Sequence, residues 1–165
     1  MIWKLLACIF MTVTAAFIVT VIMDIRKKNK TKLDFKNDFD NLGLPIITLK
    51  VVEKDNIKEY NFIVDTGSTI NIIDSNILEN LDYEPLDINT EILGVDGAVG
   101  KSTGCILKII ANQEKYKCDF ISRDMSASFG YIKDEKGIDI HGLLGRTFLN
   151  EFKCKIDFSK YQLYK

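Results

Sequence analysis

The sequence predicts an all-β domain, closed like a β-barrel and carrying one or two short helices, behind an N-terminal transmembrane helix. Two observations lead to this prediction. From about residue 43 onward, short runs of apolar and often β-branched residues alternate with polar residues at a period of two, between turn residues. Ahead of that point, the segment Leu5–Met23 has no charged side chain. We therefore divide the chain into residues 1–25 (transmembrane anchor or signal segment), 26–42 (basic and polar linker) and 43–165 (folded domain).

The apolar N-terminal segment has the length of a membrane span. Its roughly 19 residues would form a helix of about 28 Å, close to the roughly 30 Å of a bilayer core. Trp3 lies where an interfacial aromatic residue is expected, and the segment is apolar on all sides, unlike an amphipathic core helix. It also exceeds the usual apolar core of a signal peptide. We predict an uncleaved single-pass anchor; the alternative is a cleaved signal and a secreted or periplasmic domain.

The basic residues around this segment predict the side of the membrane. Lys4 alone precedes the apolar run, whereas five basic residues follow it: Arg26, Lys27, Lys28, Lys30 and Lys32. The positive-inside rule then places the folded domain in the cytoplasm. The cysteines agree with this side, because the three that follow the apolar run cannot all pair within one domain, and a reducing compartment leaves thiols free.

Charge and composition exclude several other classes of protein. Lysine and arginine (22 residues) nearly balance aspartate and glutamate (23 residues), and the pI is about 5.9, so no nucleic-acid partner is expected. His141 is the only histidine, and with scattered cysteines it does not give the spacing of a metal site. No metal and no cofactor are predicted, and His141 is expected to be structural rather than catalytic.

The elements of the folded domain follow from local patterns in chain order. Alternation predicts strands at residues 45–53 and 58–65, which form a hairpin through a turn at residues 54–56. A third strand is expected at residues 70–74, followed by a short helix that Ser75 would cap. Four further segments complete the prediction: two strands around a glycine-rich centre (90–111), a strand (114–124), a strand that ends as a short helix (137–152) and a closing hairpin (154–165).

One predicted strand runs directly into an acidic turn. The apolar residues Phe62–Val64 are followed by Asp65, Thr66, Gly67 and Ser68. Asp and Gly are common turn residues, so an ordinary loop is one explanation. The other explanation is catalytic: two facing carboxyl groups that share a proton can remove a proton from water and donate one to a peptide bond.

The sequence of this turn resembles the active-site loop of the aspartic peptidases of the pepsin and retropepsin clan, which is Asp-Thr/Ser-Gly-Ala/Ser. A second segment, Leu143, Leu144 and Gly145, resembles the apolar-apolar-glycine strand that crosses the aspartate loop in that clan. The closing hairpin also resembles the end of many members, so the resemblance covers nearly all of the predicted folded domain. It implies a retropepsin-like lobe.

The resemblance also implies a role for each residue of the loop. Asp65 is the expected catalytic residue, Thr66 ties the two loops of the active enzyme together, and Gly67 lets backbone N–H groups approach the carboxylate. Ser68 is expected to donate a hydrogen bond to the outer oxygen of Asp65. The chain has one Asp-Thr-Gly motif, as in retropepsins, which dimerise. The second aspartate is therefore expected to be Asp65 of another copy, across a two-fold axis.

A glycine-rich segment is predicted to be the tip of a hairpin that closes over the substrate, because the family has a glycine-rich flap at about this position. The residues assigned to this flap are Gly94, Val95, Asp96, Gly97 and Ala98. An ordinary hairpin turn is the plainer explanation, since Asp-Gly is a strong turn signal. A degenerate second aspartate loop, with Asp96 as the partner carboxylate, is the rival interpretation, but Asp96 is too close to Asp65 in sequence for two lobes.

These observations predict a membrane-anchored aspartic endopeptidase that acts on a peptide or protein substrate as a homodimer. Water would be activated between two Asp65 carboxylates. The alternative is a catalytically inactive retropepsin-fold module that dimerises or binds peptides. The intact sequence of residues 65–68 favours the enzyme.

Overall fold

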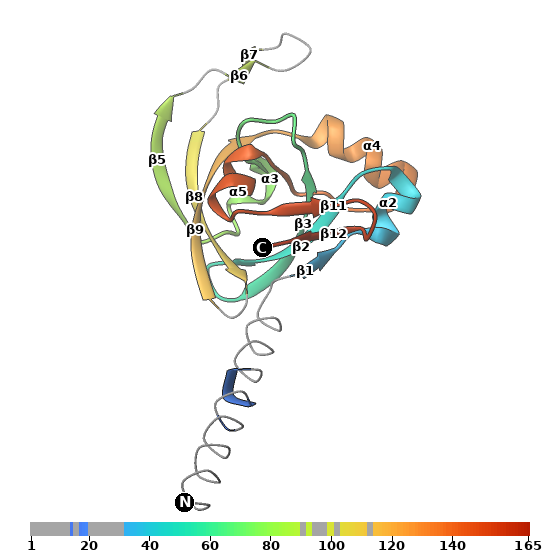
Figure 1. Ribbon diagram of the computed structural model, residues 1–165. Helices are drawn as coiled ribbons and strands as arrows, with labels where there is room; N and C mark the ends of the chain where they lie inside the picture. The colour runs from blue at the N-terminus through green and yellow to red at the C-terminus, as the bar shows by residue number, and fades with distance from the viewer. Residues whose placement is uncertain are drawn as a thin grey trace, which may run out of the picture. The chain divides into compact units, whose positions relative to one another are not determined.

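The computed structural model describes residues 14, 17–19, 32–89, 92–93, 99–100, 103–111 and 114–165 (Figure 1). The chain divides into two compact units, Met1–Thr31 and Lys32–Lys165. The predicted anchor lies outside the described residues, apart from Thr14 and the helical residues 17–19. Within the described part of the chain, no helix has both the length and the apolar character needed to cross a bilayer.

The second unit is built around one main β-sheet. Its strands, in order across the sheet, are β2 (Ile46–Val52), β3 (Ile57–Val64), β10 (Gly142–Leu144), β4 (Ile72–Asp74), β9 (Glu114–Arg123), β8 (Thr103–Ala111) and β5 (Tyr83–Asn89). A further pairing of β2 with β8, at Lys50↔Ile110 and Val51↔Ile109, closes the sheet on itself. The prediction of a mostly β, barrel-like domain is confirmed (Figure 1).

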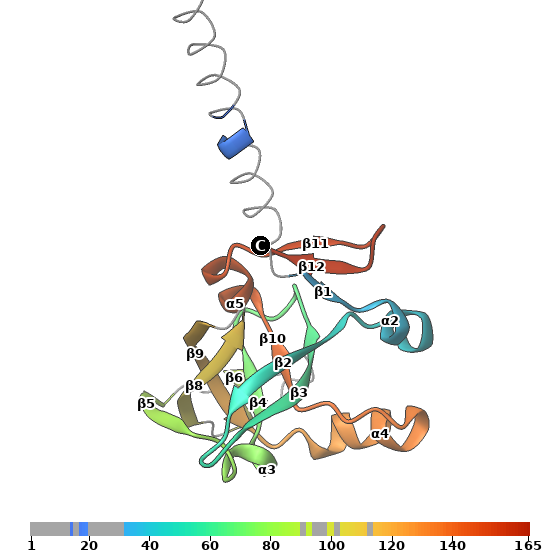
Figure 2. The same ribbon diagram turned by 90° about the horizontal axis from the view of Figure 1, so that it is seen from below.

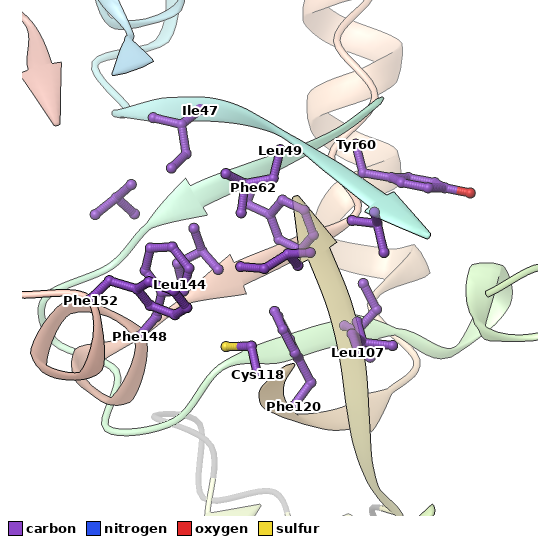
Figure 3. Close-up of a cluster of buried hydrophobic side chains, with 14 of the residues drawn as sticks. Ile47, Leu49, Tyr60, Phe62, Leu107, Cys118, Phe120, Leu144, Phe148 and Phe152 are labelled. Carbon is purple, nitrogen blue, oxygen red and sulfur yellow. The ribbon is translucent and has the colours of Figure 1, made fainter. Parts of the chain in front are cut away.

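The predicted hairpin of residues 45–65 is confirmed as β2 and β3, and the predicted strand at 114–124 is β9, which forms a second long hairpin with β8. Strands β2 and β3 pair antiparallel from Ile46↔Ile63 to Val52↔Ile57, and β8 pairs antiparallel with β9 along its whole length. In β2 the exposed residues Thr48 and Lys50 alternate with buried apolar ones. The buried side chains meet in one core, which includes Ile47, Leu49, Tyr60, Phe62, Leu107, Cys118, Phe120, Leu144, Phe148 and Phe152 (Figure 3). Each large apolar side chain buried in this way contributes about 1.5–3 kcal/mol to folding.

The helices are more numerous than the one or two that the sequence predicts. In the second unit they are α2 (Lys36–Leu42), α3 (Ser75–Leu78), α4 (Ser126–Lys136) and α5 (Arg146–Glu151). The predicted cap of α3 is wrong by one residue: Asp74 is the N-cap, because its carboxylate accepts a hydrogen bond from the Asn76 N–H at 3.2 Å. Helix α4 was not predicted; its Phe129 joins Ile46, Ile63 and Ile140 in a second apolar cluster.

The predicted boundary of the folded domain at residue 43 is wrong, because the second half of the predicted linker is folded. Strand β1 (Lys32–Asp34) pairs with β12 (Gln162–Tyr164), which also pairs with β11 (Lys155–Asp157) of the closing hairpin (Figure 2). Phe35, at 1% exposed, packs its ring against Phe158 at a centroid distance of 5.8 Å. Burial of this aromatic side chain, together with a long-range strand pairing, holds residues 32–42 in the domain.

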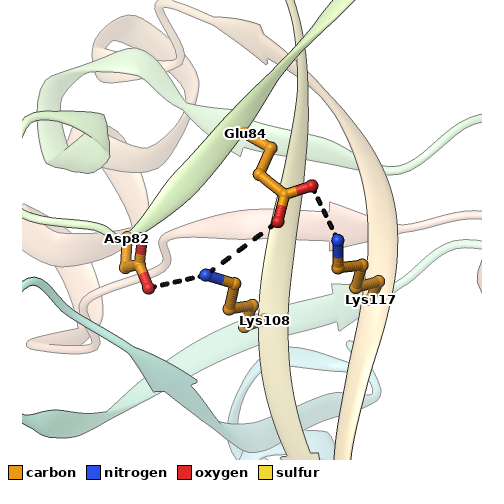
Figure 4. A network of polar contacts seen from close by, with 4 residues as sticks. All are labelled: Asp82, Glu84, Lys108 and Lys117. Atoms are coloured by element: carbon orange, nitrogen blue, oxygen red, sulfur yellow. Dashed lines mark hydrogen bonds and ion pairs between the residues drawn. The ribbon is translucent and has the colours of Figure 1, made fainter.

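Strand β5 is a further element that the sequence does not predict. It pairs with β8, and the short strands β6 (Ile92–Leu93) and β7 (Val99–Gly100) pair with each other beyond it (Figure 1). On the outer face, Lys108 contacts Asp82 at 2.8 Å and Glu84 at 4.0 Å, while Lys117 contacts Glu84 at 2.7 Å (Figure 4). Lys117 is exposed and the other three residues are partly exposed, so salt screens these charges, and they orient β5 on its neighbours more than they stabilise the fold.

Candidate active site

Asp65 stands at the point where β3 leaves the sheet. The last residues of that strand, Phe62–Val64, are buried, whereas Asp65 is half-buried. Its backbone N–H donates to the carbonyl of Leu144 at 3.0 Å. The buried strand and this bond fix the backbone of Asp65, while its carboxyl group remains accessible to solvent and to a reactant.

The turn that follows Asp65 folds back on the carboxylate. The Gly67 N–H donates to Asp65 Oδ1 at 2.8 Å, and the Ser68 N–H donates to the Asp65 carbonyl at 3.2 Å. A Cβ atom added at Gly67 would lie 3.1 Å from Asp65 Oδ1, so a side chain there would crowd the carboxylate. Thr66 and Gly67 are both exposed. The turn therefore orients the carboxyl group and presents it at a surface.

The expected hydrogen bond from Ser68 to the Asp65 carboxylate is not present, and that expectation is corrected. The Ser68 hydroxyl instead donates to the carbonyl of Ile70 at 2.8 Å, two residues further along the chain. This is a local side-chain-to-backbone bond of the kind that serine makes in turns. Ser68 therefore stabilises the loop rather than the carboxylate of its own chain.

The segment that resembles the crossing strand lies directly beside this loop. Strand β10 is inserted between β3 and β4: it runs parallel to β3, with Leu143↔Ile63 and Leu144↔Val64, and antiparallel to β4. Leu144 is fully buried and Leu143 half-buried. Strands that are distant in sequence thus meet at Asp65. The Leu144 carbonyl of β10 accepts the hydrogen bond that fixes the backbone of Asp65.

Gly145, at the end of β10, lies in very close contact with the backbone of the aspartate loop. An added Cβ atom at this position would lie 2.2 Å from the carbonyl oxygen of Ile70 and 2.9 Å from that of Ser68. Distances under 3.0 Å to backbone atoms cannot be relieved by turning a side chain. A glycine is required here because the end of β10 rests on the backbone of the aspartate loop.

The start of α5 adds further bonds to the same loop. The Arg146 N–H donates to the Ser68 carbonyl at 2.9 Å, and Thr147 donates to the Thr69 carbonyl through its N–H at 3.1 Å and its hydroxyl at 2.7 Å. The Arg146 guanidinium lies 3.4 Å from Thr69 Oγ1. Arg146 and Thr147 are exposed, so these bonds lie at the same surface as the turn.

The predicted flap falls in a part of the chain that the structure does not describe. The flap residues outside the described part are Gly94, Val95, Asp96, Gly97 and Ala98. The rival interpretation, in which Asp96 is the partner carboxylate, therefore concerns a residue that is not described either. What the structure describes are the flanks of that segment, which pair at Ile92↔Gly100 and Leu93↔Val99 as the two sides of a hairpin.

His141 lies next to β10, and it contacts β3 at residues ahead of the aspartate turn. Its Nδ1 accepts the Asn61 N–H at 3.2 Å, and its ring packs edge-on against Tyr60 at a centroid distance of 4.9 Å. Burial lowers the pKa of the imidazole below its ordinary value, and the nearby Asp139 carboxylate opposes this shift only in part. The ring is therefore neutral at neutral pH.

This lowered pKa gives a testable dependence of stability on pH. Between the folded pKa and the ordinary value of about 6.5, the unfolded chain binds a proton that the folded chain does not, so stability is lost as pH falls through that window. We expect His141→Gln to flatten the fall in the free energy of unfolding between about pH 7 and 5, measured by urea denaturation. Equal slopes for the variant and the wild type would contradict this role of His141.

The cysteines of the folded domain are expected to be unreactive. Cys105 and Cys118 are buried and Cys154 is half-buried, all as free thiols. Burial raises the pKa of Cys105 to about 12 and that of Cys154 to about 11. Thiols that are protonated at neutral pH are poor nucleophiles and poor metal ligands. Across the described ranges, no three His, Cys, Asp or Glu side chains gather as they would around a metal ion.

One residue of the site was missed by sequence analysis. Asn71 is 1% exposed, and its side chain bonds to the start of α5 and to β9. The available signal was an amide side chain between the apolar residues of the predicted strand at 70–74, but its partners lie 48 and 74 residues away in sequence.

Among known proteins, this chain is similar to several whose structures have been solved. No family model matches the chain, and no curated protein matches it. The chain is similar to the EIAV protease complexed with the inhibitor HBY-793, with 18% identity, a TM-score of 0.46, and coverage of 67% of this chain and 91% of that chain. It is also similar to a retropepsin-like aspartic protease from Rickettsia conorii, with 16% identity, a TM-score of 0.47, and coverage of 82% and 88%. A third similar structure is the retroviral protease-like domain of Ddi1 from Leishmania major, with 12% identity, a TM-score of 0.36, and coverage of 68% and 81%.

Proposed function

We propose that this chain is an aspartic endopeptidase that works as a homodimer, with Asp65 of each copy supplying one carboxyl group to a shared catalytic centre. The observation that carries the proposal is the construction around Asp65. A half-buried carboxylate is oriented by the Gly67 N–H, and its backbone is fixed by the Leu144 carbonyl of an inserted strand. An ordinary turn needs no such support from a segment about 80 residues away.

The proposed chemistry needs two carboxyl groups that share a proton. Two like charges held close together cannot both ionise, so one group stays protonated while the other is ionised. The ionised group takes a proton from water as the water oxygen attacks the peptide carbonyl carbon, and the protonated group donates its proton to the carbonyl oxygen. Collapse of the tetrahedral intermediate, with proton transfer to the amide nitrogen, breaks the peptide bond. A bell-shaped dependence of kcat/KM on pH follows.

The second carboxyl group would come from another copy of the chain. The sequence has one Asp-Thr-Gly motif, and the exposed position of Thr66 and Gly67 leaves the turn open to an equivalent turn. Two copies that meet here would be related by a two-fold axis through the site, with the same residues on both sides. The hydroxyl of the exposed residue Thr66 would then tie the two loops together.

The N-terminal segment is proposed to anchor this dimer in a membrane. The uncharged run Leu5–Met23 and the basic residues after it support a single-pass anchor with the folded domain on the cytoplasmic side. Two chains confined to one membrane have a raised local concentration, which favours pairing. N-terminal sequencing of the mature protein separates this proposal from a cleaved signal and a secreted domain.

The proposed activity is tested by incubating the purified full chain with an unfolded protein and identifying new peptide termini by mass spectrometry. We expect cleavage that is blocked by a statine-type compound, whose tetrahedral hydroxyl mimics the intermediate, and not by a chelator or a thiol reagent. A chain that binds this inhibitor or the unfolded protein without producing new termini would instead be a peptide-binding module. Cleavage that the inhibitor does not affect would contradict the aspartic mechanism.

A further inference from the structure

The side chain of Asn71 is buried, and both its nitrogen and its oxygen have hydrogen-bond partners. Its Nδ2 donates to the Asp119 carbonyl at 2.9 Å and contacts Cys118 Sγ at 3.6 Å. Its Oδ1 accepts the N–H of Gly145 at 2.9 Å and the N–H of Phe148 at 3.3 Å. The side chain therefore joins the segment that follows the aspartate loop to β9 and to the start of α5.

These bonds form a short path to the catalytic candidate. Asn71 holds the Gly145 N–H, the preceding residue Leu144 holds the Asp65 N–H through its carbonyl, and Gly145 itself rests on the backbone of the loop. A small movement of Gly145 would therefore be passed to the backbone of Asp65. Reactions that depend on two carboxyl groups facing each other are sensitive to such movements, since a displacement of about 1 Å can cost about 100-fold in rate.

No other common side chain of this size provides the same set of bonds. An aspartate would place a carboxylate oxygen against the Asp119 carbonyl, which also offers only lone pairs. A leucine would leave the N–H groups of Gly145 and Phe148 without an acceptor in a buried place, where an unpaired polar group is costly. Residue 71 must therefore offer both a hydrogen-bond donor and an acceptor, and a planar carboxamide group does so in a small buried space.

We propose that Asn71 is a positioning residue for Asp65: it sets the depth at which the end of β10 sits against the aspartate loop. It does not touch the reacting atoms. The catalytic part of this inference rests on the proposed function, whereas the structural part, the control of the Asp65 backbone, stands without it.

The test compares Asn71→Ala and Asn71→Ser with the matched control Asn61→Ala. Asn61 also donates through its side-chain amide to a backbone carbonyl, that of Asp139 at 2.9 Å, but it is only half-buried, and its side-chain partners, Asp139 and Thr48, are not part of the path from Gly145 to Asp65. We expect Asn71→Ala to lower kcat on a peptide substrate by about tenfold or more with KM within about twofold, the pattern of a lost transition-state alignment. Asn71→Ser keeps a hydroxyl acceptor and is expected to fall between Asn71→Ala and the wild type, and Asn61→Ala to leave kcat within about twofold.

Amide hydrogen exchange gives a readout that needs no catalytic activity. In Asn71→Ala, the protection factor of the Asp65 amide is expected to fall by about tenfold or more, while amides in β2 and β8 change little. An Asp65 amide as protected as in the wild type would overturn the proposal, whether or not the enzyme is active. If the wild type cleaves no peptide but the Asp65 amide responds as expected, the proposed function fails and the positioning role holds.

The wild type supplies a decisive measurement if the variants do not fold. The Asp65, Gly145 and Phe148 amides should then exchange through one shared opening, with the same dependence on denaturant. Independent opening of Asp65 and Gly145 would show that the path through Asn71 does not position the aspartate.

Discussion

Replacing Asp65 by asparagine is expected to abolish peptide hydrolysis while the fold persists. The carboxamide has almost the same shape as the carboxylate, and its oxygen can still accept the Gly67 N–H that now bonds to Oδ1. It can neither take a proton from water nor donate one at working pH, so both proton transfers are lost. General acid–base catalysis typically contributes about 10²–10⁴-fold to a rate, and we expect a loss at the upper end of that range or beyond it.

The measurement for Asp65→Asn is kcat/KM on a peptide, with circular dichroism and thermal unfolding as the check on the fold. Asp55→Asn is the matched control, because Asp55 is exposed in the turn between β2 and β3 and the change in charge is the same. We expect this control to retain full activity. Hydrolysis by Asp65→Asn at a rate near that of the wild type would remove Asp65 from the mechanism.

Replacing Gly145 by alanine is expected to cause a large loss of stability. The added methyl group would lie 2.2 Å from the Ile70 carbonyl oxygen, 2.8 Å from its carbon and 2.9 Å from the Ser68 carbonyl oxygen. Since all three are backbone atoms, the end of β10 and the aspartate loop must move apart. Overpacking of this kind costs about 1–3 kcal/mol or more, and the separation would also strain the bonds that hold Asp65. For a domain of this size, a loss of about 3 kcal/mol lowers Tm by roughly 10 °C.

The matched control for Gly145→Ala is Gly130→Ala in the middle of α4. A Cβ atom added there would meet no heavy atom within 4 Å outside the neighbouring backbone of α4. In addition, alanine favours a helix over glycine by about 1 kcal/mol. Gly130→Ala is therefore expected to leave Tm unchanged or to raise it. Thermal unfolding of both variants tests the contrast. A Gly145→Ala protein as stable as the wild type would show that the contact between the two segments can relax.

Local patterns were sufficient to predict most of the barrel. Strands β2, β3, β4 and β9 and the closing hairpin follow from alternation and turn residues, and each was expected close to its observed bounds. A buried strand that ends in an acidic glycine turn is likewise visible in the sequence at Asp65. These features depend on residues near one another in the chain.

The features that were missed depend on contacts between distant residues. Strand β5 contains Pro85 and the two charged residues Glu84 and Asp87, so its pairing with β8 outweighs a weak local preference. Helix α4 buries Phe129 and has little amphipathic pattern, so periodicity does not reveal it. The membership of β1 in the folded domain depends on its pairing with β12, more than 120 residues away.

The details of the site were less predictable than its location. The Ser68 hydroxyl had two possible acceptors, and the Ile70 carbonyl, which is nearer along the chain, takes the bond. The role proposed for Asn71 depends on Gly145 and Asp119, and sequence spacing gives no indication that these two residues meet at one amide. Geometry of this kind follows from the closed sheet rather than from any motif.

The central claim, that each active site uses Asp65 from two copies of the chain, is tested most directly by mixing subunits. Wild-type protein is allowed to exchange with a threefold excess of Asp65→Asn protein, and hydrolysis is measured per wild-type subunit. If both carboxyl groups are needed, only pairs of two wild-type subunits act, and the rate per wild-type subunit falls to about a quarter of its value without the variant. A rate per wild-type subunit that does not change with the excess of variant, once exchange is complete, would contradict the account.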